Sequence, residues 1–277
     1  MRMWLAAAGA AVLLASPAAA TTILYNDFSS TAGLQLNGAA AGAVDGSGRH
    51  VLRVTPSQFS QAGSAFSTNP VTLGATESFS TRFTFDFNAQ QNGGADGVVF
   101  TVQTNSNNVG GAGGGIGYAG IPNSLGVEFD NWNNGTIDAN SDNHVGVDLN
   151  GDISSVAFGF PSFQLDSGQD ITAWIDYNGA ANLLEVRYAL GTPRPTLANI
   201  SYVVNLANVL QSTNAFVGFT SGTGAAAANH DIINWEFRDT FSPINAGVPE
   251  PATWGLMLVG FGAMGSVLRR RRASLTA

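Results

Sequence analysis

The sequence predicts an all-β fold, a β-sandwich or jelly roll, from three observations. Between residues 79 and 87 phenylalanines alternate with polar residues, so one face of a strand is buried. Seven further apolar runs have strand length, and joints rich in Gly and Asn separate most of them. No stretch of ten or more residues in the body has a helical period with caps. Many short strands with such joints and almost no helix are typical of a β-sandwich.

The expected strands follow one another without a clear break. They occupy residues 79–87, 98–102, 125–129, 145–149, 171–177, 183–190, 216–220 and 232–237. Asn178-Gly179 supplies residues that tolerate positive φ, which predicts a hairpin between two of these strands. Residues 110–117 have the composition of a flexible linker, but they stand between two good strands. We therefore expect one domain, and no repeat of fixed period divides it.

Both ends of the chain differ from this body. Arg2, an apolar run over residues 3–15 and a small-residue end at Ala20 predict a signal peptide over residues 1–20. Residues 252–268 are apolar or small and reach the lower limit for a transmembrane helix. Four arginines, 269–272, follow and would keep the C-terminus in the cytoplasm. We expect the body, residues 21–247, to be exported.

The tail, residues 248–277, resembles the PEP-CTERM sorting signal of Gram-negative bacteria. The resemblance rests on Pro249-Glu250-Pro251, on Trp254 shortly after it, on one short apolar helix and on the arginine cluster. It implies removal of the tail by an exosortase-type membrane enzyme, after a transient anchor in the inner membrane, and a final place at the cell surface or in the extracellular matrix. The physical pattern alone also fits an ordinary C-terminal anchor.

Composition limits the partners of the body. The chain has no cysteine, so burial, strand pairing or metal must hold the exported domain together. Residues 21–247 contain six arginines, no lysine and eighteen acidic residues, a net charge of −12 with histidine neutral. Such a surface repels nucleic acid and anionic lipid headgroups, and divalent cations are its natural counter-ions. We expect no nucleic-acid partner.

The segment VEFDNWNNGTIDANSDNH, residues 127–144, concentrates four carboxylates, several amides and a histidine. In a strand Glu128, Asp130 and Trp132 share one face, while Val127 and Phe129 point into the core. The following loop offers Asn134, Asp138, Asn140, Asp142 and His144. Converging carboxylates repel unless a cation lies between them. Oxygen ligands favour Ca²⁺ and an added imidazole favours an ion such as Mn²⁺, which predicts a two-metal site; spacing alone also fits a solvated acidic loop.

This segment resembles the metal loop of the legume-lectin (L-type, concanavalin-like) family, which has Glu-x-Asp-x-aromatic-x-Asn, a later Asp, and a His before an apolar strand. The matching residues are Glu128, Asp130, Trp132, Asn134, Asp138 and His144. The resemblance implies a concanavalin-like jelly roll, Mn²⁺ held by Glu128, Asp130, Asp138 and His144, and Ca²⁺ held by Asp130, Asp138, Asn134 and the Trp132 carbonyl oxygen. The family usually places its second Asp five residues before the His, where this chain has Ala139. Either the loop carries an insertion and Asp138 is the ligand, or Asp142 substitutes.

Three more segments agree with the resemblance in chain order. Ala95-Asp96-Gly97 resembles the family segment whose Asp follows a cis peptide bond and accepts hydrogen bonds from sugar hydroxyls. Residues 114–117 resemble its glycine loop, and residues 217–220 and 230–237 resemble its last two strands around a variable loop, residues 221–229. The implied sugar contacts are Asp96 as acceptor, the Gly114 N–H and Asn134 amide as donors, Trp132 as a stacking plate, and Gly224 in the variable loop. Each residue also has a structural alternative, as a turn or core position.

Three functions fit these residues. The first is an exported, metal-dependent carbohydrate-binding protein without catalytic residues, in which metal orients the sugar contacts. The second is a glycoside hydrolase on the same architecture, but the segment after Glu128 and Asp130 lacks the partner carboxylate of a retaining enzyme, expected at about 5–5.5 Å. The third is a structural matrix protein in which cations replace disulfides. The small residues 222–227 predict shallow binding made useful by multiplicity.

Overall fold

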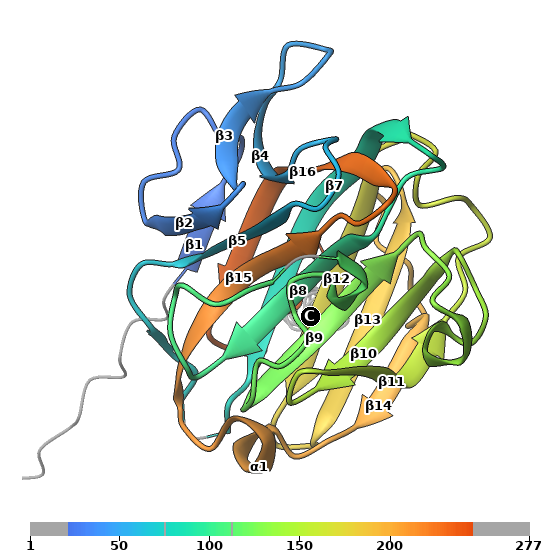
Figure 1. Ribbon diagram of the computed structural model, residues 1–277. Helices are drawn as coiled ribbons and strands as arrows, with labels where there is room; N and C mark the ends of the chain where they lie inside the picture. The colour runs from blue at the N-terminus through green and yellow to red at the C-terminus, as the bar shows by residue number, and fades with distance from the viewer. Residues whose placement is uncertain (1–21, 75, 112, 246–277) are drawn as a thin grey trace, which may run out of the picture.

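The computed structural model describes residues 22–74, 76–111 and 113–245. Two antiparallel sheets of eight strands each face one another as a sandwich (Figure 1). The back sheet contains β14 (Ile200–Val203), β13 (Leu183–Leu190), β12 (Ile171–Asn178), β7 (Phe79–Gln91), β16 (Ala227–Arg238), β4 (His50–Thr55) and β3 (Ala41–Val44) in this order, and β1 (Thr22–Tyr25) pairs with β16. The front sheet contains β11 (Asp152–Gly159), β10 (His144–Leu149), β9 (Ser124–Asp130), β8 (Gly97–Gln103), β15 (Asn214–Gly222), β5 (Ala62–Ser67) and β2 (Leu34–Gly38), and β6 (Val71–Thr72) pairs with β15. The predicted all-β sandwich is confirmed.

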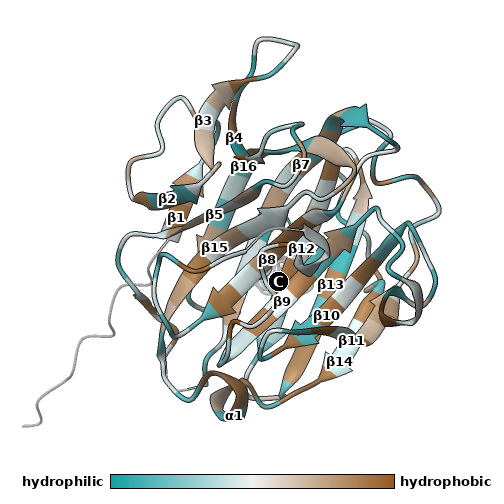
Figure 2. Cartoon of the chain, viewed as in Figure 1, coloured by the Kyte–Doolittle hydropathy of each residue, from teal (hydrophilic) through white to brown (hydrophobic). Residues whose placement is uncertain are grey.

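The core lies between the sheets and follows the alternation of the sequence. The phenylalanines of β7 are fully buried, as are the apolar residues of β8, β9 and β15 that face them. Phe83 meets Phe129 and Phe219 of the front sheet edge-on, with ring centroids 5.7 and 5.0 Å apart. Brown and teal alternate along these strands in Figure 2. Both sheets and this core fall within the described residues.

All eight predicted strands are present, and β12 and β13 form the predicted hairpin, with Asn178 paired to Leu183. The expected reason for this hairpin, a positive φ at Asn178-Gly179, is wrong. The residue with positive φ is Asn182, at 52°, and not Gly179. Gly179 is needed for a different purpose, because a Cβ there would overlap the carbonyl oxygen of Thr76.

Helical structure is limited to one short α-helix, α1 (Leu206–Leu210), and two 3₁₀ turns, η1 (Gly113–Gly115) and η2 (Gly135–Asp138), in the part of the chain that the structure describes. No helix there is long and apolar enough to cross a membrane. The expected signal peptide, residues 1–20, and the expected sorting tail with its helix, residues 248–277, lie outside the described residues.

Candidate metal and carbohydrate site

The site begins at the end of β9, in the middle of the front sheet. The register of β9 and β10 pairs Asp130 with His144 and Glu128 with Gly146. Directly paired residues share a face, so Glu128, Asp130 and His144 lie together on the face opposite to the core. Gly146 leaves room for the glutamate, because a Cβ at this position would overlap the Glu128 Oε1 atom.

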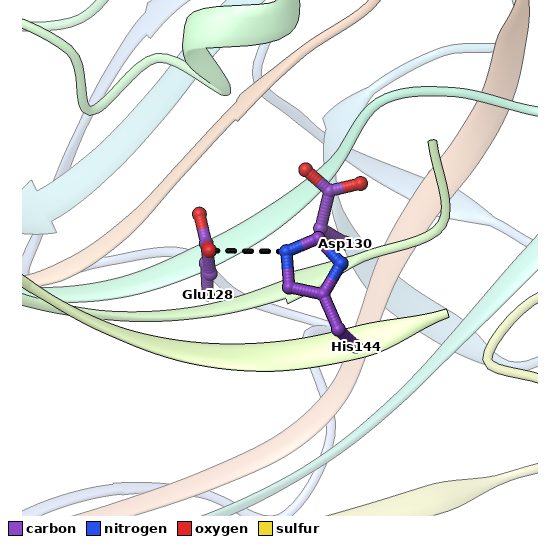
Figure 3. Close-up of side chains that lie close together, drawn as sticks. All are labelled: Glu128, Asp130 and His144. Carbon is purple, nitrogen blue, oxygen red and sulfur yellow. Dashed lines mark hydrogen bonds and ion pairs between the residues drawn. The ribbon is translucent and has the colours of Figure 1, made fainter. Parts of the chain in front are cut away.

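Glu128, Asp130 and His144 each offer a ligand atom, and these atoms lie within 4.8 Å of one another. The His144 Nε2 atom is 3.2 Å from Glu128 Oε1, and Asp130 stands beside the imidazole ring (Figure 3). All three side chains are buried, and the described residues provide no hydrogen-bond partner for His144 Nδ1. Two carboxylates and an imidazole suit a divalent transition ion such as Mn²⁺. The donor set therefore fits the metal that the sequence predicts.

Electrostatics support the same interpretation. Burial and the charge of Glu128 raise the pKa of Asp130 well above its usual range. Burial also raises the pKa of Asp138, and burial together with the charge of Asp138 raises that of Asp96 to about 6. A divalent cation among these carboxylates would replace the protons that they otherwise retain.

The structure separates the two candidates for the second aspartate. Asp138 ends η2, is buried, and accepts a hydrogen bond from the Asn134 N–H through Oδ2. Its charge raises the pKa of both Asp130 and Asp96, which places it near them. Ala139 and Asn140 follow Asp138 with φ of 51° and 59°, which makes a left-handed turn before His144. Asp142 is exposed and lines a hollow outside the cluster.

The expected sugar contacts come from four loops that meet beside this cluster. The Ala95–Asp96 peptide bond is cis, as the family resemblance implies. The Asp96 N–H donates to the Gly222 carbonyl oxygen at 3.1 Å, and the Asp96 carbonyl oxygen accepts from the Asn131 N–H at 3.1 Å. The buried Asp96 Oδ2 atom has no hydrogen-bond partner among the described residues.

Two close approaches complete this arrangement. A Cβ built on Gly224 would lie 3.5 Å from Asp96 Oδ2 and 3.9 Å from the Cα of Gly113. A Cβ built on Gly114 would lie 2.9 Å from the Asn134 Nδ2 atom. The structure therefore brings Asp96, Gly114, Asn134 and Gly224 together, and we call these four residues the cradle.

Trp132 differs from its expected place. β9 ends at Asp130, so Trp132 belongs to the following loop rather than to the strand face, and its N–H donates to Asp130 Oδ1 at 2.6 Å. Its partly buried side chain lines a hollow to which none of the cradle residues contributes. Its role as the stacking plate stays a prediction.

Sequence reasoning missed the groups behind the site. Ser155 Oγ of β11 lies 2.8 Å from Glu128 Oε1 and 2.6 Å from Asp148 Oδ1, and Asp148 is fully buried. The two-residue spacing of His144, Gly146 and Asp148 was a usable signal, because alternate residues of a strand share a face. Nothing in the sequence around Ser155 indicates its partners, since β11 was not predicted.

A second buried group supports the Asp96 loop. His230 Nδ1 is 2.7 Å from Thr55 Oγ1 and 3.1 Å from Ser221 Oγ. Ser221 Oγ in turn donates to the Gly97 carbonyl oxygen at 2.7 Å. Burial lowers the pKa of His230 to about 3, so this ring is neutral and structural.

Comparison with known families decides the identity of the fold. Residues 20–250 match the legume lectin domain, which is most of the chain. The chain belongs to the legume lectin family. Residues 247–272 match the PEP-CTERM protein-sorting motif. The lectin family implies carbohydrate binding without catalysis, and the sorting motif implies export with exosortase processing.

Relatives and solved structures agree with this assignment. The L-type lectin-domain containing receptor kinase VIII.1 of Arabidopsis thaliana is 32% identical over 210 residues, which cover 73% of this chain and 28% of the relative. Receptor kinase I.7 of the same plant is 30% identical over 247 residues, 81% of this chain and 36% of the relative. This lectin thus spans about a third of those kinases, whose kinase activity lies in other domains.

The similar solved structures are plant lectins. A lectin from Bauhinia forficata in complex with GalNAc has a TM-score of 0.67 and 25% identity, over 79% of this chain and 98% of that one. Basic winged bean lectin with Tn-antigen has a TM-score of 0.67 and 27% identity, with the same two coverages. The sandwich described above is therefore a legume-lectin fold.

Proposed function

We propose that this legume-family lectin binds a polysaccharide through the cradle and that binding depends on Ca²⁺ and Mn²⁺. The observation that carries the proposal is the convergence of Glu128, Asp130 and His144 within 4.8 Å, next to the four cradle residues. Mn²⁺ would be held by Glu128, Asp130, Asp138 and His144. Ca²⁺ would be held by the carboxylates of Asp130 and Asp138, the Asn134 side chain and the Trp132 carbonyl oxygen. The metals supply positive charge that keeps these carboxylates ionised and their loops in place.

The residues of this chain would then perform the recognition. Asp96 Oδ2, buried and without a partner among the described residues, accepts a hydrogen bond from a sugar hydroxyl. The Gly114 N–H and the Asn134 amide donate hydrogen bonds to neighbouring hydroxyl oxygens. Gly224 leaves the space beside Asp96 open, because any side chain there would approach its carboxylate.

The test is a glycan array probed with the body, residues 21–247, with Ca²⁺ and Mn²⁺ and again after EDTA dialysis. We expect binding to disappear with EDTA and to return when the metals are restored. The Asp96→Asn variant should lose glycan binding and keep metal binding, which separates the cradle from the metal site. Binding that survives EDTA contradicts the mechanism.

For location, we propose that the signal peptide directs export in a Gram-negative host and that the tail anchors the chain transiently in the inner membrane. Exosortase-type cleavage would then leave the lectin at the cell surface or in the exopolysaccharide matrix. The sorting-motif match and the order of the motif, apolar stretch and arginine cluster support this sequence of events. Cell fractionation of a variant with residues 269–272 changed to Ser should show the chain retained unprocessed or mislocalised. Normal processing of this variant counts against the anchor.

A structural matrix role is the second candidate. Two observations favour this role: the chain has no cysteine, and the acidic residues of β9 and β10 are buried. Bound cations would stabilise such a fold with or without a glycan. A protein that gains thermal stability with metal and binds no polysaccharide on the array would decide for this role.

A further inference from the structure

A hollow of about 320 Å³ lies next to the cradle. Its walls include Gly93 from the loop before β8, Asn131 and Trp132 from the loop after β9, Asp142 from the loop before β10, and Gln164 and Asp166 from the loop between β11 and β12. Two of these loops also build the cradle. Sites for small molecules begin at about 300 Å³, whereas a single water or ion needs far less. The size of the hollow therefore suits a ring-sized ligand.

Asn131 indicates what kind of ligand would fit. Its side chain is only 5% exposed and lines the hollow, yet neither Nδ2 nor Oδ1 has a hydrogen-bond partner among the described residues. A buried amide without partners is unfavourable and rare in native proteins. The amide offers two donors and one acceptor, which match hydroxyl groups that both accept and donate. Sugar hydroxyls have this chemistry.

The charge of the hollow adds a second requirement. Asp142 and Asp166 both line it, and none of the other lining residues carries a positive charge. The two carboxylates are near enough for Asp142, after the larger effect of burial, to raise the pKa of Asp166. Trp132 also lines the hollow, and an indole ring attracts ammonium groups.

We propose that this hollow is a subsite for a sugar unit with a protonated amine, in a glycan whose neighbouring unit occupies the cradle. The amine lies between the carboxylates of Asp142 and Asp166, and the ring hydroxyls reach Asn131. The inference deepens the proposed function and rests on it, because the cradle holds the adjoining unit. The preferred substrate class is thus a partly deacetylated amino-sugar polymer rather than a neutral one.

The experiment is calorimetric titration of the metal-loaded body with tetramers of glucosamine and of N-acetylglucosamine that have the same linkage, under conditions where the free amines are protonated. We expect the amine tetramer to bind about five- to tenfold more tightly, as two partly exposed ion pairs would give. The double variant Asp142→Asn/Asp166→Asn should lose this preference and keep its affinity for the neutral tetramer. The matched control Asp27→Asn/Asp152→Asn removes two exposed charges elsewhere and should keep the preference.

The outcomes separate the two proposals. Four results would overturn the amine subsite. The unaltered protein binds both tetramers equally or binds neither, both double variants keep the preference for the amine tetramer, or Asp142→Asn/Asp166→Asn loses its affinity for the neutral tetramer. Amine binding that depends on Asp142 and Asp166 but survives both EDTA and Asp96→Asn supports the subsite and contradicts the metal-dependent cradle. Salt should weaken the preference, because these carboxylates are only partly shielded from solvent.

Discussion

Replacing Ser155 by alanine should weaken metal binding although serine is outside the proposed ligand set. Its hydroxyl lies 2.8 Å from Glu128 Oε1 and 2.6 Å from Asp148 Oδ1. A hydroxyl has one hydrogen, so it can donate to only one of two carboxylates. The other contact requires a proton on a carboxyl group, and burial, with the nearby charge of Glu128, raises the pKa of Asp148 well above its usual range. Ser155 therefore donates to Glu128 and accepts from Asp148, which burial and the charge of Glu128 keep protonated.

The magnitude follows from these contacts. A hydrogen bond to a charged group contributes about 1.5–3 kcal/mol, and loss of a residue that orients a metal ligand typically costs about 10- to 100-fold in metal affinity. We expect Ser155→Ala to lower Mn²⁺ affinity within that range, which corresponds to about 1.4–2.7 kcal/mol. Titration followed by Mn²⁺ electron paramagnetic resonance measures it directly.

Ser154 provides the matched control on the same strand. It is exposed, and the contact recorded for it involves only its backbone N–H. Ser154→Ala should bind Mn²⁺ like the unaltered protein. If Ser155→Ala does so as well, Glu128 is not oriented through this hydroxyl and the reasoning fails.

Three further predictions test the same region. Gly146→Ala should overlap Glu128, destabilise the metal-loaded protein by about 1–3 kcal/mol and abolish Mn²⁺ binding; a variant with native metal affinity would show that the glycine is not required. Asp138→Asn should lower Ca²⁺ affinity at least tenfold while Asp142→Asn leaves it unchanged in calorimetry, and the reverse order would assign the second aspartate to Asp142. Because the folded-state pKa of Asp130 is raised, this acid should stabilise the metal-free protein at low pH, and its contribution should be lost as pH rises through the raised value. Metal competes with these protons, so the rise in melting temperature on adding metal should be larger near pH 7.5 than near pH 5. A rise independent of pH would show that metal and protons do not compete for these carboxylates.

The sequence was informative where strands are long and carry large apolar residues. The alternation in residues 79–87 predicted β7 because each buried Phe is separated by a polar residue. Strands such as β3, with the sequence Ala-Gly-Ala-Val, were missed since they carry small residues and lie mainly exposed at a sheet edge. Edge strands are specified by their neighbours more than by their own side chains.

In the candidate site, too, residues on regular strands were predictable and residues in loops were not. Glu128, Asp130 and His144 were predictable because β9 and β10 are both regular strands, so alternation places the side chains. The burial of Asp138 and the exposure of Asp142 were not predictable, because they depend on the left-handed turn at Ala139, and such loop geometry leaves no periodic signal. The amide of Asn131 could not be predicted either, because its lack of partners depends on loops distant in sequence.

The proposed metal and sugar sites of this lectin are connected through backbone groups, which gives the proposed metal dependence a physical route. The Asp138 carboxylate accepts a hydrogen bond from the Asn134 N–H, and the Asp130 carboxylate accepts one from the Trp132 N–H. Asn134 in turn stands against Gly114 of the neighbouring loop. In the proposed mechanism, loss of metal would let repulsion and protonation of the two aspartates weaken these hydrogen bonds, and the Asn134 amide would lose its fixed position in the cradle. Under this proposal, a sugar that never touches an ion would still require one, because the carboxylates that would bind the metal also position the donor that would bind the sugar.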